Sequence, residues 1–305
     1  MVVFENDLKD YGWAQTRSAE EKQKRNQELD RALQWLAERQ IKVRGHYLMQ
    51  TATPENLLKK NADEVRAHYL DSLTERMNFV GNRVIEWDVI NHPIAWSGAD
   101  MLTKKPGLEQ IDREVFRAAL KHSQLPMFIN EDQIFRPGHQ SDATYEYIKQ
   151  LKAEGFPVAG LGNQAHFDES FLPSPVDILK TTDHFAEIVP TQVVTEYDVT
   201  TTADEALAAD FTRDIMIACF SHPSYHGFLL WGFWEGTHWK PQAASWNKDW
   251  TIRPRGEVFT QLVTEEWDTK ITAQTDATGR INWRGFPGLY EIKSNNTALP
   301  SIECR

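Results

Sequence analysis

Residues 87–91 read WDVIN, and His92 follows them directly. Val89 and Ile90 favour a buried β-strand, which we predict over residues 83–90 (RVIEWDVI). Asn91 and His92 come immediately after it, so the strand would deliver polar side chains to its C-terminal end. A strand of this kind belongs in a sheet whose strand ends carry the functional groups.

The same pattern recurs along the chain, because short apolar runs alternate with longer amphipathic segments. Predicted strands cover residues 1–5, 41–48, 83–90, 125–130, 157–164, 190–198 and 226–233. Predicted helices lie between them, near residues 19–39, 55–79, 108–122, 140–154, 174–186 and 204–221. Regular alternation of this type predicts βαβ units and a parallel sheet.

The placement of polar residues favours a barrel over an open sheet. Asn91, Asn130, Gln164, Glu196 and Trp231 each lie at or just beyond the C-terminal end of a predicted strand. Barrel enzymes keep their catalytic groups at this end. Because we count seven strands where a barrel needs eight, we predict an α/β fold, a (β/α)8 TIM-type barrel with its first strand missing. Residue 1 would then not be the biological start of the domain.

A second, smaller unit follows the predicted barrel. Residues 268–293 read DTKITAQTDATGRINWRGFPGLYEIK, and the alternation around the TDATG turn predicts a β-hairpin. We therefore divide the chain into a barrel at residues 1–267 and a C-terminal β-hairpin appendage at residues 268–305.

Composition narrows the class of protein. A net charge of −11 argues against nucleic-acid binding, and the chain lacks the run of eighteen apolar residues that a membrane span needs. The two cysteines, Cys219 and Cys304, offer neither a disulfide framework nor metal-ligand spacing, so we predict no metal and no organic cofactor. The N-terminus does not read as a signal peptide. Eleven Trp, several of them within 231–250, are typical of a sugar-stacking surface as well as of a core.

Glu196 is the strongest candidate for a reactive group. It lies in VVTEYD, at the end of a predicted buried strand, while GLGNQAHF ends another strand with Gln164 and His166. A histidine beside a carboxylate can hold it by a hydrogen bond, and Asp198 could hold the imidazole from the other side. Such a network keeps Glu196 ionised and oriented as a nucleophile.

Six motifs, in order along the chain, resemble those of glycoside hydrolase family 10, the endo-β-1,4-xylanase family. They are FENDLK (4–9), RGHYL (44–48), WDVIN (87–91), NQAHF (163–167), TEYDV (195–199) and WGFWEGTHW (231–239). The resemblance implies sugar-binding roles for Glu5, Asn6, Lys9, His46, Asn91, Trp231 and Trp239. It implies that Glu196 is the nucleophile and that Gln164, His166 and Asp198 support it.

The resemblance also implies a retaining mechanism with two carboxyl groups. The family has its acid/base Glu at the position of His92, which leaves three alternatives. His92 acts as the acid, another carboxylate (Glu86, Asp88, Asp132 or, best placed, Glu131) replaces it, or the groove only binds glycan. Imidazole titrates near pH 6.5, and a nearby carboxylate raises that pKa, so the first alternative is chemically sound.

Further residues of the groove follow from the same resemblance. Gln50 occupies a position where the family usually has Trp, His238 lies between the paired tryptophans, and Asn130 and Glu131 end the neighbouring strand. We predict a β-glycanase that hydrolyses β-1,4-xylan-type polysaccharide with retention and an altered acid/base. The alternative is a weakly active or inactive glycan-binding relative on the same barrel. In either case we expect a monomer, extracellular or periplasmic, whose partner is xylan or a related hemicellulose.

Overall fold

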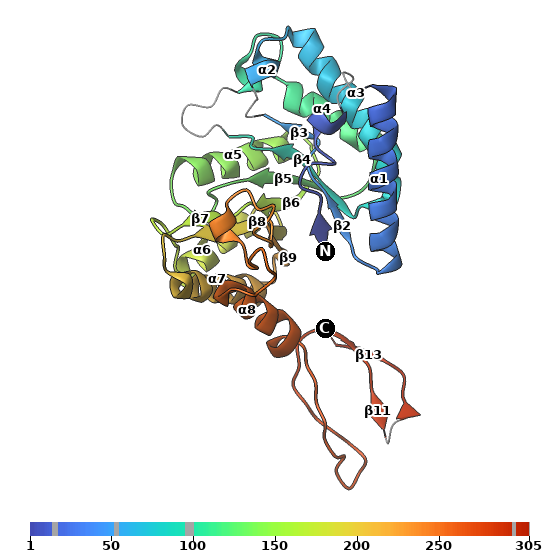
Figure 1. The fold of residues 1–305 in the computed structure, drawn as a ribbon, viewed down its shortest axis with the longest axis vertical. Coiled ribbons are helices and arrows are strands. Elements are labelled where there is room, and N and C mark those ends of the chain that lie inside the picture. Colours follow the sequence, from blue (N-terminus) through green and yellow to red (C-terminus); the bar gives the residue numbers. More distant parts are fainter. Residues whose placement is uncertain (14–17, 52–54, 95–100, 295–296, 305) are drawn as a thin grey trace.

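The computed structural model describes residues 1–13, 18–51, 55–94, 101–294 and 297–304. Seven parallel strands form the wall of a barrel and follow one another around it in chain order (Figure 1). They are β1 (Val2–Val3), β2 (Val43–Gly45), β4 (Glu86–Asn91), β5 (Met127–Glu131), β6 (Val158–Asn163), β8 (Thr191–Thr200) and β9 (Tyr225–Leu230). Two short strands, β3 (Met49–Gln50) and β7 (His166–Asp168), pair with β4 and β8. The predicted barrel fold is confirmed.

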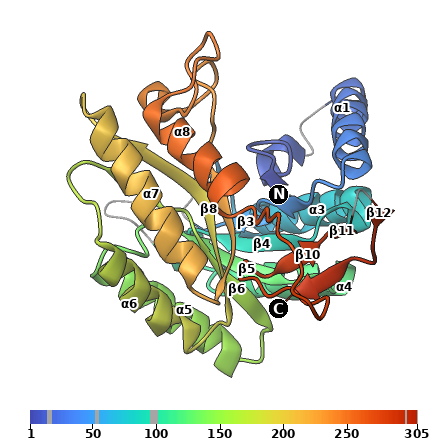
Figure 2. The ribbon, with the colours of Figure 1, turned by 90° about the horizontal axis from the view of Figure 1, so that it is seen from below.

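Helices surround this wall (Figure 2). They are α1 (Ala19–Glu38), α2 (Glu55–Leu58), α3 (Ala62–Val80), α4 (Ile111–His122), α5 (His139–Ala153), α6 (Pro175–Ala186), α7 (Glu205–Ser221) and α8 (Pro254–Gln261). Shorter turns of helix are η1 (Asp10–Trp13), η2 (Gly81–Arg83), η3 (Leu102–Lys104), η4 (Pro241–Ala243) and η5 (Leu262–Glu266). Within the described ranges, no helix is both long enough and apolar enough to span a bilayer.

The barrel is not fully closed. Among the strand pairs of the described residues, none joins β1 to β9, so these two strands are the unpaired edges of the barrel wall. The two edges nevertheless approach closely, because a Cβ added at Gly227 of β9 would lie 2.8 Å from Met1 Cε.

The observed helices differ from the predicted ones in two places. The segment 55–79 divides into α2 and α3, because Asn61 begins a new helix by a capping box with Glu64. Helix α8 was not predicted, since PRGEVFTQ contains Pro254 and Gly256, which read as loop residues. Gly256 is needed there, because a Cβ at this position would lie 2.5 Å from the Ser245 carbonyl oxygen.

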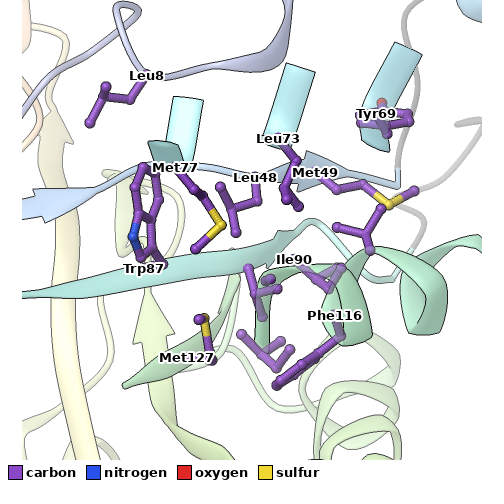
Figure 3. Packing of buried hydrophobic residues seen from close by; sticks show 14 of the residues in the cluster. Leu8, Leu48, Met49, Tyr69, Leu73, Met77, Trp87, Ile90, Phe116 and Met127 are labelled. Atoms are coloured by element: carbon purple, nitrogen blue, oxygen red, sulfur yellow. The ribbon is translucent and has the colours of Figure 1, made fainter. Parts of the chain in front are cut away.

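The main hydrophobic core lies between the barrel wall and helices α3 and α4 (Figure 3). Trp87 and Ile90 of β4 and Met127 of β5 pack there against Leu73 of α3 and Phe116 of α4, all of them buried. Each fully buried side chain of this size contributes about 1.5–3 kcal/mol. This packing fixes the position of β4, and therefore of the polar residues at its end.

The C-terminal segment projects away from the barrel (Figure 1). It contacts the barrel through Phe220 of α7, whose ring stacks on Trp267 at 4.0 Å and meets Phe286 at 5.2 Å. The hairpin predicted around TDATG is wrong in position: a turn closes there, from Gly279 N to Asp276 O at 2.9 Å, but the strands lie further on. They form two antiparallel pairs, β10 (Gly288–Tyr290) with β13 (Ile302–Cys304) and β11 (Lys293–Ser294) with β12 (Thr297–Ala298).

Candidate active site

Backbone hydrogen bonds align the ends of four neighbouring strands. His92 N donates to Asn130 O at 3.0 Å, Gln164 N donates to Glu131 O at 2.9 Å, and Glu196 N donates to Gln164 O at 3.1 Å. The side chains predicted to gather at the C-terminal ends of β4, β5, β6 and β8 therefore come from directly adjacent positions.

Glu196 lies at the centre of this group and is 5% exposed. Asn130 Nδ2 donates to its Oε1 at 2.7 Å, His166 Nε2 lies 3.4 Å from its Oε2, and His46 Nε2 lies 3.8 Å from its Oε1. Burial alone would raise the pKa of Glu196, but the charges of His46, His166 and His92 outweigh burial and lower that pKa to about 2. The carboxylate is therefore ionised at neutral pH.

His166 connects Glu196 to Asp198. Its Nδ1 lies 3.0 Å from Asp198 Oδ2, which also accepts a hydrogen bond of 2.7 Å from Trp239 Nε1. Burial would lower the pKa of His166, but the two carboxylates on either side of the ring raise it to about 10. The predicted grouping of Glu196, His166 and Asp198 is thus present, and the imidazole is cationic over the physiological range.

A chain of amide hydrogen bonds joins Glu196 to His92. Asn130 Nδ2, which bonds Glu196, also donates to Asn91 Oδ1 at 2.9 Å. Gln164 Nε2 donates to the same Asn91 oxygen at 3.0 Å and lies 3.2 Å from His92 Nε2. These side chains come from the ends of β4, β5 and β6 and from within β8, so the network depends on the register of these four strands.

His92 is held firmly in a strained conformation. Its φ of 47° is in the left-handed region, which costs a non-glycine residue about 1–2 kcal/mol. The hydroxyl of Thr51 donates to its carbonyl oxygen, and its backbone N–H is bonded to β5. The imidazole is 18% exposed, with Nδ1 3.0 Å from Glu131 Oε1. Burial would lower the pKa of His92, but the hydrogen bond to Glu131 and the nearby carboxylates raise it.

Aromatic rings form one wall beside Glu196. The ring of Trp231 meets that of His46 at 5.4 Å, edge to face, and Trp239 meets His166 in the same way at 5.1 Å. Lys9 Nζ lies 5.3 Å from the Trp231 ring centroid. Burial lowers the pKa of Lys9, although Glu196 acts in the opposite direction. The candidate residues of β1, β2, β8 and β9 therefore surround one carboxylate.

Other predicted residues lie at the margin of this arrangement. Gln50 Oε1 accepts a hydrogen bond of 3.3 Å from Asn91 Nδ2. Glu5 is exposed and lines a cavity, whereas the exposed Asn6 pairs with the hydroxyl of Tyr11. His238 is buried, and burial lowers its pKa; its Nδ1 accepts from Lys240 N at 3.0 Å.

Two cavities adjoin the aromatic wall. One of about 420 Å³ lies between the β1 and β9 edges and is lined by Glu5, Trp231, His238 and Trp239, among others. Another, of about 190 Å³, is lined by His166, and Trp239 lines both. Neither is lined by Glu196, which is 5% exposed, or by His92, whose side chain is 18% exposed.

Two buried residues beneath the site, Arg44 and Thr195, were not predicted. Arg44 is fully buried and forms ion pairs with Glu86 and Asp88, and Asp88 Oδ2 lies 2.9 Å from His46 Nδ1. Thr195 donates to Asn130 Oδ1 at 2.7 Å, which fixes the orientation of that amide. Sequence alone gives no signal for Thr195, because a threonine in a strand is ordinary. Glu86 and Asp88, which the sequence offered as possible substitute acids, are thus bound to Arg44, and Asp88 also to His46.

Comparisons with known proteins concern the family and the fold of this chain. A family model described as glycosyl hydrolase family 10 matches residues 1–262. Among curated proteins, the anti-sigma-I factor RsgI6 of Acetivibrio thermocellus is 28% identical over 272 residues, covering 83% of this chain and 32% of that protein. Endo-1,4-beta-xylanase 1 of Arabidopsis thaliana is 26% identical over 311 residues, covering 99% of this chain and 31% of the relative. The chain thus spans about a third of the length of these relatives.

Solved structures show the same fold. Native xylanase 10B from Thermotoga maritima matches with a TM-score of 0.72 and 21% identity, covering 87% of this chain and 86% of that one. A mutant of xylanase 10C from Cellvibrio japonicus in complex with xylopentaose matches with a TM-score of 0.70 and 16% identity, covering 85% and 60%. At these identities the likeness concerns the fold.

Proposed function

Because the chain belongs to glycosyl hydrolase family 10, we propose that it hydrolyses β-1,4-xylan-type polysaccharide with retention of configuration. Glu196 is the nucleophile and His92 has the role of acid/base. The observation that carries this proposal is the buried, ionised Glu196 joined to His92 through side chains at four neighbouring strand ends.

The chemistry follows from the two protonation states. Glu196 attacks the anomeric carbon while the His92 imidazolium gives its Nε2 proton to the leaving oxygen, and a covalent glycosyl-enzyme forms. The neutral imidazole then takes a proton from water, which attacks the same carbon and releases Glu196 as a carboxylate. The raised pKa of His92 favours the protonated form that the first step requires.

The setting of the site supports a glycan partner. Trp231 and Trp239 offer ring faces to pyranose C–H groups, and Lys9 and Glu5 offer hydrogen bonds to hydroxyls. We further propose that residues 1–267 form the catalytic barrel and residues 268–305 an appendage. The protein would act as an extracellular or periplasmic monomer, with no nucleic-acid or membrane partner.

A second candidate function is glycan binding without efficient turnover. Two observations favour it: His92 lies where the resemblance calls for a carboxylic acid, and one relative, from Acetivibrio thermocellus, is named as an anti-sigma-I factor. General acid catalysis is worth about 10²–10⁴-fold, so a site without it would act mainly on substrates with good leaving groups.

Aryl β-xylosides with good leaving groups, followed by natural xylan, separate the two functions. If the protein turns over both substrates, and this activity is lost in His92→Ala but kept in His226→Ala, the result supports the hydrolase function. His226 serves as the control because it is exposed near the start of β9, at the opposite end of that strand from Trp231. Turnover of the aryl xyloside alone, unchanged in His92→Ala and increased in His92→Glu, supports an impaired site. If the protein binds xylan but turns over neither substrate, and His92→Glu also turns over neither, the proposed hydrolase function is refuted.

A further inference from the structure

Glu131 is a buried carboxylate to which the proposed reaction assigns no role. It is the last residue of β5, which lies beside β4 (Figure 1), and it is fully buried. Its Oε1 accepts from Asp132 N at 2.8 Å and faces His92 Nδ1 at 3.0 Å, while its Oε2 accepts from Ile94 N at 3.0 Å. Within the described part of the chain, its one ion-pair partner is His92.

This geometry decides which ring nitrogen of His92 can react. A carboxylate only accepts hydrogen bonds, so Nδ1 carries a proton that it donates to Glu131. Nε2 is then the atom that gains and loses a proton, and it is the one beside Gln164 and the network that leads to Glu196. The two backbone N–H groups on Glu131 fix its carboxylate, which in turn fixes the plane of the imidazole.

We propose that Glu131 is a positioning residue that holds Nδ1–H of His92 and keeps Nε2 loaded with the proton that the leaving group receives. This inference rests on the proposed function, because it assigns His92 as the acid. Glu131 does not itself reach substrate, since it is fully buried behind the imidazole.

One contact opposes the loaded state. The amide nitrogen of Gln164 donates to Asn91 and, as an amide nitrogen, cannot accept a hydrogen bond. It can therefore bond His92 Nε2 only while the imidazole Nε2 carries no proton. Protonation therefore requires Gln164 to turn away, at the cost of a neutral hydrogen bond. A hydrogen bond between charged groups is about twice as strong as a neutral one, so the Glu131–imidazolium pair prevails.

The surroundings of the ring act in the same direction as Glu131. The charged groups that face His92 are Glu131 and Asp132 from the end of β5 and Glu196 from β8, and all three are carboxyl groups. Burial works against a charged ring, and the raised pKa of His92 shows that the carboxylates outweigh it. Of these three carboxyl groups, Glu131 is the one hydrogen-bonded to His92. Its removal should therefore let burial lower the pKa of His92.

The test compares Glu131→Gln with Glu131→Asp, which keeps the charge. In Glu131→Gln we expect the imidazole pKa of His92, followed by NMR titration of its ring protons, to fall by about 1–2 units, and the alkaline limb of kcat/KM to move by the same amount. Turnover of an aryl xyloside with a poor leaving group should fall about tenfold or more at pH 7, against less than about threefold for a dinitrophenyl xyloside, which needs no proton. Glu131→Asp should recover part of the loss.

The NMR titration keeps this inference separable from the proposed function. A pKa of His92 that is the same in Glu131→Gln and the parent overturns the inference, whatever the activity. Equal losses on both aryl xylosides also overturn it, because they would mean a structural role alone. A shifted pKa in a protein that turns over neither substrate supports the role of Glu131 on the ring and refutes the hydrolase instead.

Discussion

Gly162 offers a way to disturb the amide network from behind, without changing any residue of the site. It lies in β6 directly opposite Asn130 of β5. A Cβ at this position would overlap Asn130 Oδ1 and lie 3.0 Å from Thr195 Cγ2. Because Asn130 is fully buried and bonded on three sides, to Thr195, Asn91 and Glu196, it cannot move without breaking those bonds.

The expected loss in Gly162→Ala follows from those bonds. A hydrogen bond to a charged group is worth about 1.5–3 kcal/mol, and the Asn130–Glu196 bond is of this kind. If the variant loses it in the transition state, kcat/KM on an aryl xyloside falls roughly 10- to 150-fold. Overpacking should also lower the free energy of unfolding by about 1–3 kcal/mol.

Gly160→Ala is the matched control, because it lies two residues earlier in the same strand. A Cβ there would lie 2.5 Å from the Thr191 carbonyl oxygen and overlap the ring of Phe128, so the core is overpacked but the amide network is not touched. We expect a similar loss of stability, measured by urea unfolding, with kcat/KM reduced less than about threefold. Parent-like activity in Gly162→Ala, or an equal loss in both variants, would refute the reasoning.

Two further predictions concern stability, and a third concerns the appendage. The pKa of His166 is about 10 in the folded state, against 6.5 in the unfolded state. Protonation of His166 therefore stabilises the fold fully below pH 6.5, and this stabilisation is lost as the pH rises toward 10. His166→Asn should therefore flatten, by a few kcal/mol, the fall in unfolding free energy measured between pH 6 and pH 10. Arg44→Met removes the guanidinium from the buried Glu86 and Asp88 and leaves Asp88 with His46 alone, so the free energy of unfolding in urea should fall by about 3–5 kcal/mol; a loss below about 1 kcal/mol would contradict this. Deletion of residues 268–305 removes the contact of Phe286 with Phe220 but should leave aryl-xyloside turnover within about twofold of the full chain, and a larger loss would mean that the appendage supports the barrel.

The fold could be predicted because its signals are local. Alternating strand and helix patterns located all seven barrel strands, and the polar residues at their ends indicated the barrel and its functional rim. The errors arose where local signals were ambiguous. Gly256 reads as a loop residue but sits in α8 because only glycine fits against Ser245, and the strands of the appendage lie beyond the turn at Asp276.

The site could be predicted as a set of residues but not as a network. Glu196, His166 and Asp198 share two strand ends, so their grouping followed from position alone. The contact between His92 and Glu131 depends on the register of β4 against β5 and on the left-handed turn at His92, and neither is visible in the sequence. Glu131 was therefore considered as a substitute acid, whereas in the structure it lies behind the imidazole.

In a retaining reaction the pKa of the acid is high in the first step and lower in the second. A histidine in the acid position would change its pKa in the same direction as a glutamic acid. While Glu196 is ionised, its negative charge favours the proton-bound form of any neighbouring acid, whether that form is a neutral carboxylic acid or a cationic imidazolium. In the reaction that we propose, Glu196 becomes an ester and loses its charge, which would lower the pKa of His92 and make the ring the base that the second step needs. What changes is the net charge, which is one unit more positive with histidine than with a glutamic acid. The buried Glu131 supplies the compensating negative charge at 3.0 Å from Nδ1, so that the cationic acid does not have to be buried alone.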